Sequence, residues 1–238
     1  MIMMRLDGRL GNNLFQYATV RSVAEKNGYE FALTGNGIDT GVMGLFDLDY
    51  GVISQSPAYA FHDNHCYNPL VWEIPDFTLM TGYYQSEKYF DEAKVRQWFT
   101  PKFSVDSDPA VCYIHFRGGD YNIPPWNSYQ LPNSYYQEAM DRMRLINENL
   151  RFVVVTDDIY EAVIRFPDLD IISNAKEHDF VLLYQAKYLI ISNSSYSWWT
   201  AWLNTDNIVI APQGWNLYNI DKSDFSPKDI KVDRWIWI

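Results

Sequence analysis

The second half of the chain alternates strand-like and helix-like segments, and this alternation restricts its fold more than any other feature of the sequence. Short runs typical of buried strands cover residues 111–116, 152–155, 168–173, 189–191 and 208–210. Between them lie segments in which apolar residues have helical spacing, at about 134–143, 159–165, 180–188 and 195–203. Strands that alternate with helices in this way predict an α/β domain around a parallel sheet.

Two of these helices carry residues that predict how they begin. Ser134 is followed three residues later by Gln137, which predicts a capping box at the start of the first helix. Asp179 directly precedes the third helix and is expected to cap it. Both predictions concern where a helix begins, which the apolar spacing alone leaves open.

The first half of the chain is less regular. Its start predicts a strand, a glycine-containing turn and a helix, at residues 2–6, 7–12 and about 13–26. Gly28 is placed to end that helix, and residues 29–80 show short β-like runs without a long helix. Polar sequence with prolines between residues 100 and 109 is typical of a linker. We therefore predict two domains, 1–105 and 106–238.

Charge and composition exclude several classes of protein. Lys and Arg number 19 against 30 Asp and Glu, and this net charge of −11 argues against nucleic acid as the main partner, because a phosphate backbone requires a basic face. Two cysteines are too few for a disulfide framework. The N-terminal apolar stretch is too short for a signal peptide, and no window is apolar enough for a transmembrane helix. We therefore expect a cytoplasmic protein, with most of its aromatic residues in the core.

Polar residues gather where three of the predicted strands end. Ligands of open α/β sheets bind outside the carboxyl ends of the strands, so we expect these residues to converge on one binding site. The end of strand 111–116 carries His115, Arg117 and Asp120. Strand 152–155 is followed by Asp157 and Asp158, and strand 189–191 is followed by Asn193, Ser194 and Ser195.

Several of these residue types suit an anionic ligand. Arg117 offers guanidinium donors beside two glycines, although a surface ion pair with Asp120 is the alternative interpretation. Ser194 and Ser195 precede a helix, and a helix N-terminus attracts anions, although serine is also an ordinary N-cap. An arginine and a helix N-terminus together can hold a diphosphate without a metal ion.

Three carboxylates have two interpretations each. Asp157 and Asp158 could bind ribose hydroxyls, or they could cap a helix and order their loop. Asp179 could accept hydrogen bonds from the N1–H and the N2 amine of a guanine, or it could act only as a helix cap.

Other motifs are weaker signals. The turn at residues 7–12 brings Arg9 and Asn12 to the end of a strand of the first half, but it lacks the spacing of a P-loop. Asp-x-Asp sequences, which can hold a divalent metal with a nucleotide diphosphate, occur without a clear preceding strand at 47–49, 106–108 and 168–170. Three possible metal ligands, His62, His65 and Cys66, lie close together in the sequence. They lack a fourth ligand, so they do not indicate a metal site.

Six short segments, in order along the chain, carry a family resemblance. They read GRLGNNLFQYA (8–18), GYYQSEKYF (82–90), HFRGGDY (115–121), VTDD (155–158), NSSYSWW (193–199) and APQGW (211–215). They resemble motifs of glycosyltransferase family 11, the α-1,2-fucosyltransferases: G-x-L-G-N-Q-x-F-Q-Y-A, G-Y-x-Q-S-x-x-Y-F, H-x-R-R-G-D-Y, F-S-D-D, N-S-[ST]-F-S-W-W and A-P-x-x-W. Each motif alone is weak, but their order along nearly the whole chain is not expected by chance.

The resemblance implies a GT-B-like α/β fold, with two Rossmann-like halves and the active site in the cleft between them. It implies an inverting glycosyltransferase that moves L-fucose from GDP-L-fucose to a hydroxyl of a glycan acceptor, O-2 of a galactoside or a similar sugar. Neither a metal nor a cofactor is expected. Residues 1–105 would bind the acceptor and residues 106–238 the GDP-sugar.

The resemblance also implies roles for individual residues. Arg117 would neutralise the diphosphate of the leaving GDP, while Asn12 and Gly11 would approach the fucose and the acceptor. Asp179, by analogy with related fucosyltransferase families, would bind guanine. We predict Arg117 and Asn12 as catalytic residues and the following as substrate-binding residues: Arg9, Gly11, His115, Asp120, Asp157, Asp158, Asp179, Asn193, Ser194 and Ser195.

Two alternatives to fucosyl transfer stay open. Gly118 stands where the family has a second arginine, which allows a different GDP-sugar as the donor. The chain is also shorter than typical members, which allows a protein that binds a sugar or nucleotide without turnover. The general base is undecided between Asp7 and Asp120.

Overall fold

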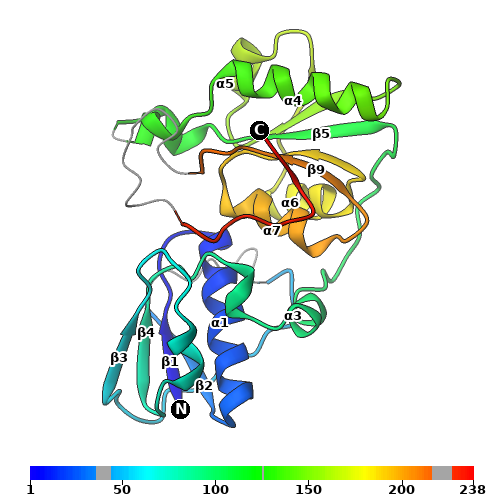
Figure 1. Cartoon of the computed structure of the whole chain (residues 1–238). Helices are drawn as coiled ribbons and strands as arrows, with labels where there is room; N and C mark the ends of the chain where they lie inside the picture. Colours follow the sequence, from blue (N-terminus) through cyan, green and yellow to red (C-terminus); the bar gives the residue numbers. More distant parts are fainter. Residues whose placement is uncertain (36–43, 125, 216–226) are drawn as a thin grey trace. The chain divides into compact units, whose positions relative to one another are not determined.

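The computed structural model describes residues 1–35, 44–124, 126–215 and 227–238 of the chain. The chain divides into two compact units, each built from a sheet and helices (Figure 1). Unit 1 comprises Met1–Lys102 and Pro227–Lys231, and unit 2 comprises Phe103–Ser226 and Val232–Ile238. The C-terminal segment therefore contributes residues to both units.

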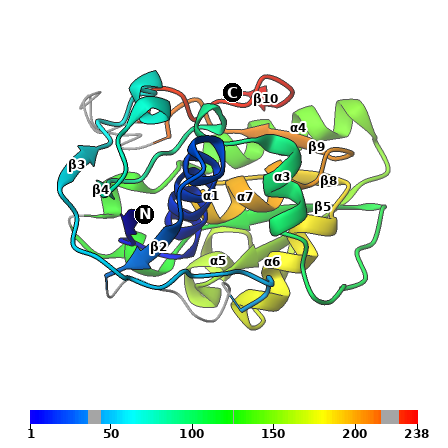
Figure 2. The same ribbon diagram turned by 90° about the horizontal axis from the view of Figure 1, so that it is seen from below.

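The described residues of unit 1 form a four-stranded parallel sheet in the order β2-β1-β4-β3. The strands are β1 (Ile2–Arg5), β2 (Phe31–Thr34), β3 (Tyr59–His62) and β4 (Thr78–Thr81). The long helix α1 (Leu10–Asn27) joins β1 to β2 and lies against the sheet (Figures 1 and 2). A short helix, α3 (Glu92–Trp98), follows β4. The predicted first strand and first helix are confirmed.

Helix α1 begins at Leu10, earlier than the predicted start at about residue 13. Gly8 takes the left-handed conformation, with φ +78°, so the chain turns before Leu10 and the helix starts directly afterwards. As a result Gly11 and Asn12 lie in the first helical turn and not in a loop. Gly28 ends the helix as predicted, with φ 69°.

The described residues of unit 2 form a six-stranded parallel sheet in the order β10-β9-β8-β5-β6-β7. The strands are β5 (Val111–Phe116), β6 (Arg151–Thr156), β7 (Asp170–Ile172), β8 (Tyr188–Ile190), β9 (Ile208–Ala211) and β10 (Ile236–Trp237). Helices α4 (Asn133–Ile146) and α5 (Ile159–Arg165) cover one face of the sheet, and α6 (Lys176–Gln185) and α7 (Ser195–Leu203) cover the other (Figure 1). This is the α/β arrangement with a parallel sheet that the alternating pattern predicts.

The two predictions about helix starts are wrong. Pro132 occupies the N-cap position of α4 without a side-chain cap, so Ser134 and Gln137 form no capping box. The proline fixes its own φ near −70°, which allows the helix to start one residue before Ser134. Helix α6 begins ahead of Asp179, which therefore lies in its first turn. The carboxylate accepts hydrogen bonds from the backbone N–H and the side-chain amide of Asn174, at 3.1 and 2.9 Å.

Aromatic side chains fill the interior of both units, as the composition suggests. In unit 2 the rings of Trp198 and Trp202 are stacked with their centroids 5.7 Å apart, and Trp199 packs edge-on against Trp198 at 5.0 Å. The largest fully buried side chains of the described residues are all aromatic: Trp198, Trp199, Trp202, Tyr17, Tyr84, Tyr89, Tyr136, Phe15, Phe46, Phe99, Phe116 and Phe180.

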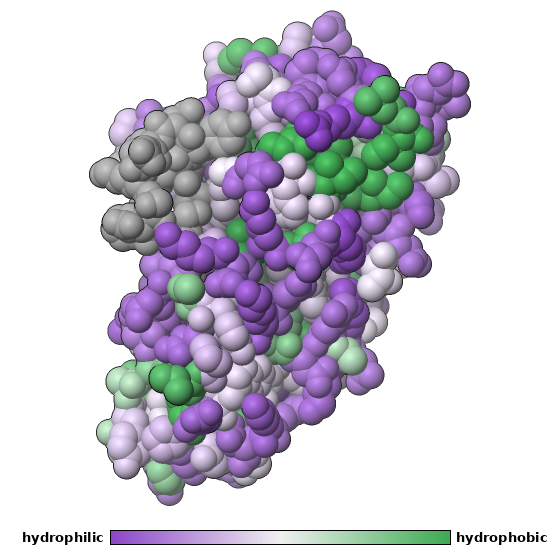
Figure 3. Space-filling view, in the orientation of Figure 1, coloured by the Kyte–Doolittle hydropathy of each residue, from purple (hydrophilic) through white to green (hydrophobic). Residues whose placement is uncertain are grey.

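The surface differs between the two units in the view of Figure 3. Unit 1 is largely hydrophilic there, with scattered hydrophobic residues, whereas hydrophobic residues gather in one area of unit 2. Within the described ranges, no helix combines the length and the apolar character needed to cross a membrane.

Candidate functional site

The three polar clusters meet at the carboxyl edge of the unit 2 sheet. Strands β8, β5 and β6 are adjacent and parallel, so the residues that follow them emerge side by side. Two contacts connect the chain at the end of β5 with the segment that follows β8. Nδ1 of His115 lies 2.8 Å from the hydroxyl of Ser192, and the hydroxyl of Tyr121 donates to the carbonyl of Asn193 at 3.4 Å. Arg117 connects to the third cluster through Asp157.

The guanidinium of Arg117 is held by two carboxylates. Nη1 donates to Asp157, and Nη2 donates to Oδ1 of Asp120 at 2.5 Å. The guanidinium also lies 5.6 Å from the ring centre of Tyr121. The ion pair with Asp120 that the sequence allowed is therefore present, and Asp157 adds a second one. A phosphate that binds Arg117 must share the guanidinium with these carboxylates or displace one of them.

Asp157 and Asp158 also hold the backbone that follows β5. Asp157 accepts from the N–H of Gly118 at 3.0 Å, and Asp158 accepts from the N–H of Gly119 at 3.3 Å. A Cβ atom at Gly118 would lie 2.4 Å from the Cβ of Asp158, so this close approach requires glycine. Asp158 further caps α5 by accepting from the N–H of Glu161 at 3.1 Å. The interpretation in which these carboxylates order their loops is the one the contacts support.

The cluster that follows β8 lies at the N-terminus of α7. Ser194 is the N-cap residue, but its hydroxyl makes no capping bond, and Ser195 begins the helix. The N–H groups of a first helical turn have no partners within the helix and carry the positive end of its dipole. Asn193 is buried and donates from its amide to the carbonyl of Tyr129 at 2.8 Å. Asn193 thus fixes the backbone, while Ser194 and Ser195 present the helix N-terminus.

His115 lies buried at the end of β5 and is uncharged at neutral pH. Its ring stacks on Tyr196 of α7, with centroids 5.4 Å apart at an angle of 26°. Burial, together with the nearby charge of Arg117, lowers the pKa of His115 to about 3. The residue therefore offers hydrogen bonds to a ligand and adds no positive charge.

Asp179 is buried in the first turn of α6. Burial raises the pKa of its carboxyl group, and the two bonds from Asn174 oppose that shift. Each carboxylate oxygen retains a lone pair beyond the bond it already accepts, so Asp179 can receive further donors. Burial also raises the pKa of Tyr196, and the charges of Asp179, Asp157 and Arg117 all act on that ring. Tyr196 therefore lies close enough to Asp179, Asp157 and Arg117 for their charges to act on its hydroxyl.

The remaining predicted residues belong to unit 1, at the start of α1. Arg9 is at the N-cap position, and Gly11 and Asn12 lie in the first turn. The amide of Gln85 donates to Oδ1 of Asn12 at 2.8 Å, and that of Gln16 donates to the carbonyl of Gly82 at 2.8 Å. Segments 8–18 and 82–90 are thus joined by two hydrogen bonds. Gln85 belongs to one of the motif segments, but nothing in the sequence alone indicates that its amide bonds Asn12.

The residues considered as metal ligands have other contacts. Nδ1 of His62 lies 2.9 Å from the hydroxyl of Thr81, and the thiol of Cys66 lies 3.7 Å from a carboxylate oxygen of Asp229. Outside the segments that the structure leaves undescribed, no group of three His, Cys, Asp or Glu side chains is arranged to hold a metal ion.

Comparison with known families decides what kind of protein carries this site. The family described as Glycosyl transferase family 11 matches residues 97–238, which is more than half of the chain. The chain belongs to glycosyltransferase family 11. The motif resemblance is thereby confirmed, and the matched range contains Arg117, Asp179 and the N-terminus of α7.

Curated relatives of this family 11 chain include two proteins of Escherichia coli. The chain is 35% identical to an α-1,2-colitosyltransferase over 181 residues, which are 66% of this chain and 61% of the relative. It is 33% identical to the O-antigen biosynthesis glycosyltransferase WbnK over 135 residues, 52% of this chain and 43% of that protein. The galactoside 2-α-L-fucosyltransferase SEC1 of Bos taurus is 25% identical over 230 residues, 82% of this chain and 62% of the relative. The chain therefore spans between 43% and 62% of the length of these proteins.

Solved structures establish the fold of the family 11 chain. The heptosyltransferase WaaC of Escherichia coli matches with a TM-score of 0.53 at 10% identity, over 100% of this chain and 92% of WaaC. The α-1,6-fucosyltransferase NodZ matches with a TM-score of 0.53 at 13% identity, over 85% of this chain and 92% of NodZ. Both are GT-B glycosyltransferases, so the predicted GT-B fold with two Rossmann-like units is confirmed.

Proposed function

We propose that this glycosyltransferase moves L-fucose from GDP-L-fucose to O-2 of a galactoside or similar sugar in a glycan acceptor, with inversion and without a metal ion. The observation that carries the proposal is the convergence of Arg117 with the N-terminus of α7 at one edge of the unit 2 sheet. The relative from Bos taurus is named a galactoside 2-α-L-fucosyltransferase, which supports the sugar and the linkage.

The reaction in this proposal is a single displacement. The acceptor oxygen forms a bond to the anomeric carbon of fucose while the bond from that carbon to the β-phosphate oxygen breaks. The proton of the acceptor hydroxyl passes to a general base, for which Asp7 and Asp120 are the candidates. Negative charge grows on the β-phosphate as the transition state develops oxocarbenium character. Arg117 and the N–H groups of the first turn of α7 oppose that charge from fixed positions, which is the most effective form of electrostatic catalysis. The proposal assigns the stabilisation of that charge to these groups and requires no divalent cation.

The neighbouring residues bind and orient the donor. In the proposal Asp179 accepts hydrogen bonds from guanine, and neutral His115 bonds the ribose or a phosphate oxygen. Asp157 and Asp158 act indirectly, because their contacts order the loops on either side of Arg117. Unit 2 thus binds the GDP-sugar, and Asn12 in unit 1 meets the acceptor.

A second donor is favoured by two observations. The chain is 35% identical to an α-1,2-colitosyltransferase, and Gly118 stands where the family pattern has a second arginine. Transfer of colitose or another sugar from a GDP donor is therefore the second candidate function. The binding groups for GDP would be the same, so only the sugar pocket separates the two candidates.

Thermal shift measurements test the nucleotide. GDP and GDP-sugars at one hundred times their Kd should stabilise the protein by about 2.7 kcal/mol, with and without EDTA, while UDP compounds should not. Transfer to a β-galactoside is then measured with GDP-fucose and with other GDP-sugars. Stabilisation by UDP compounds alone would refute the donor, and loss of transfer in EDTA would refute the absence of a metal. Binding without hydrolysis or transfer would identify a protein that binds nucleotide without turnover.

Substitution of Arg117 tests the mechanism. Loss of one preorganised donor to a developing charge costs about 100-fold or more in rate, so Arg117→Ala should lower kcat/KM by at least that factor with the fold preserved. Arg142→Ala is the matched control, because Arg142 forms an exposed pair with Glu138 on α4 of the same unit. Near wild-type turnover of Arg117→Ala would remove the arginine from the mechanism.

A further inference from the structure

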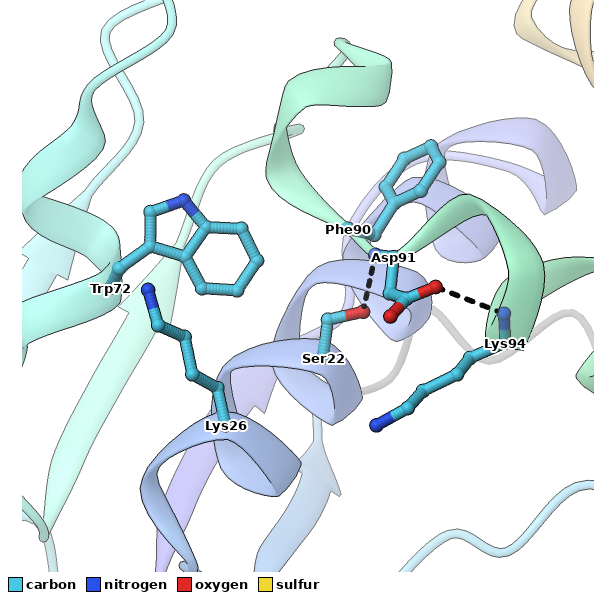
Figure 4. A pocket seen from close by; sticks show the side chains of 6 residues that line it. All are labelled: Ser22, Lys26, Trp72, Phe90, Asp91 and Lys94. Atoms are coloured by element: carbon cyan, nitrogen blue, oxygen red, sulfur yellow. Dashed lines mark hydrogen bonds between the residues drawn. The ribbon is translucent and has the colours of Figure 1, made fainter.

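Unit 1 contains a cavity of about 310 Å³ for which the proposed mechanism has no use. It lies between α1, the 3-10 helix η1 (Pro69–Glu73) and the start of α3 (Figure 4). Its volume is at the lower end of the range of small-molecule sites. Six residues line the cavity: Ser22, Lys26, Trp72, Phe90, Asp91 and Lys94.

The walls of the cavity combine aromatic surface with polar groups. Trp72 stands on one side, and Phe90 and Asp91 stand on the other (Figure 4). The indole N–H of Trp72 already donates to the hydroxyl of Tyr67 at 3.0 Å, so Trp72 offers a ligand its ring surface, which a sugar would share with the ammonium of Lys26. At the base, the hydroxyl of buried Ser22 accepts from the N–H of Asp91 at 3.3 Å and can itself donate a bond. Aromatic surface beside a few directed polar groups suits the C–H face and the hydroxyls of a sugar.

The charges around the cavity are balanced. Lys94 pairs with Glu25 at 2.8 Å, which leaves Lys26 and Asp91 as one charge of each sign. The ammonium of Lys26 lies 4.6 Å from the ring centre of Trp72, and Asp91 accepts from the backbone N–H of Lys94 at 3.2 Å as the N-cap of α3. Donors and acceptors without net charge fit a neutral polyhydroxylated ligand, and the net charge of −11 on the chain disfavours an anion.

The cavity is separate from the start of α1 but lies on the same side of that helix. Residues 82–91 run alongside α1, because Gln85 bonds Asn12 and the N–H of Asp91 bonds Ser22. Asn12 and Ser22 are ten residues apart, which corresponds to about 15 Å along a helix. A glycan with its reacting hydroxyl at Asn12 would need several sugar residues to reach Trp72.

We propose that this cavity is a subsite for a neutral sugar residue of the acceptor glycan, distant from the residue that is modified. The sugar stacks on Trp72, while Lys26, Asp91 and Ser22 bond its hydroxyls. The subsite rests on the proposed function for the identity of its ligand as an acceptor glycan. It makes the enzyme prefer longer acceptors to short ones.

Fluorine NMR detects binding at Trp72 without any transfer reaction. The protein is labelled with 5-fluorotryptophan, and the signal of Trp72 is assigned with Trp72→Phe. The probes are methyl β-galactoside and a neutral linear tetrasaccharide that ends in β-galactose. The tetrasaccharide should shift the Trp72 signal and methyl β-galactoside should leave it unchanged. An unchanged signal with the tetrasaccharide at high concentration overturns the proposal, and so does tighter binding of a tetrasaccharide that carries a carboxylate.

Acceptor kinetics provide the second measurement. Trp72→Ala should raise the KM for the tetrasaccharide about tenfold and leave the KM for methyl β-galactoside and both kcat values unchanged. Lys26→Ala, at an exposed position, should give a smaller change in the same direction and covers the case in which Trp72→Ala fails to fold. Trp98→Ala is the matched control, because its half-buried ring also lies under a cation, Arg21 at 4.2 Å, outside the cavity. Equal changes for both acceptors overturn the subsite. A shift of the Trp72 signal in a protein without transfer activity would refute the proposed function and keep the subsite.

Discussion

Asp157 provides a test in which a contact with the ribose and the observed pairing with Arg117 predict opposite changes in the affinity for GDP. Its carboxylate accepts from Arg117 and from the N–H of Gly118. If Asp157 competes with a diphosphate for the guanidinium, Asp157→Asn should tighten the binding of GDP. If Asp157 binds the ribose, the same substitution should weaken it. We expect tighter binding, because the amide oxygen of asparagine can still hold Gly118 while the competing charge is gone.

The size of the effect follows from the exposure of the ion pair. The side chain of Arg117 is 16% exposed and that of Asp157 is 34% exposed, so the pair is partly screened by solvent. Partly exposed ion pairs contribute about 0.2–1 kcal/mol. Release of Arg117 from Asp157 should therefore lower the Kd for GDP by up to about fivefold.

Isothermal titration calorimetry with GDP measures this change. In the background of Arg117→Ala the substitution of Asp157 should have no effect, because the two residues act through one interaction. Asp141→Asn serves as the control, since Asp141 pairs with Arg144 on the exposed surface of α4. A variant Asp157→Asn that folds normally and binds GDP more weakly than the wild type would refute the competition and restore the ribose contact.

Three further outcomes are expected. Gln85→Ala should lower kcat by about tenfold and leave GDP binding unchanged, because it removes the bond that orients the amide of Asn12. Steady-state kinetics measure this change, and full activity would contradict the role of Gln85 in orienting Asn12. His115 has a folded-state pKa of about 3, below its unfolded value of about 6.5, so its protonation favours the unfolded chain as the pH falls. Urea unfolding at pH 5.5 should therefore show about 1 kcal/mol less stability than above pH 7, and His115→Asn should reduce this loss. Trp198→Ala should lower the free energy of unfolding of unit 2 by about 3–5 kcal/mol, and an unchanged urea midpoint would contradict its place in the core.

The sequence predicts unit 2 far better than unit 1, for a physical reason. Helices α5 and α7 have the predicted bounds, 159–165 and 195–203, because their strands are apolar runs that end abruptly in polar residues. In unit 1 the strands β2, β3 and β4 have four residues each, too few to show a period. Strand β1 also pairs with β2 and β4, and these pairings are decided by packing between distant segments.

The sequence predicts where the candidate site lies, but not which hydrogen bonds and ion pairs its residues form. The polar clusters after β5, β6 and β8 had to meet, because parallel strands share one carboxyl edge. The double pairing of Arg117 and the bond from Gln85 to Asn12 depend on which loops touch in space. The prediction that Asp179 caps its helix failed because the helix starts earlier, with the carboxylate bound to Asn174.

The contacts of Arg117 determine how much of the phosphate charge the helix must neutralise. One guanidinium between Asp120 and Asp157 gives this part of the site a formal charge of −1. A second cation at position 118 would require Asp158 to move, since a Cβ there would lie 2.4 Å from the Cβ of Asp158. The attraction for a diphosphate must then come largely from the N-terminus of α7, where the hydroxyl of Ser194 makes no capping bond. In the proposed mechanism the N-terminus of α7 is therefore an essential part of the anion site, and we predict that Arg117 contributes fully only after a carboxylate releases it.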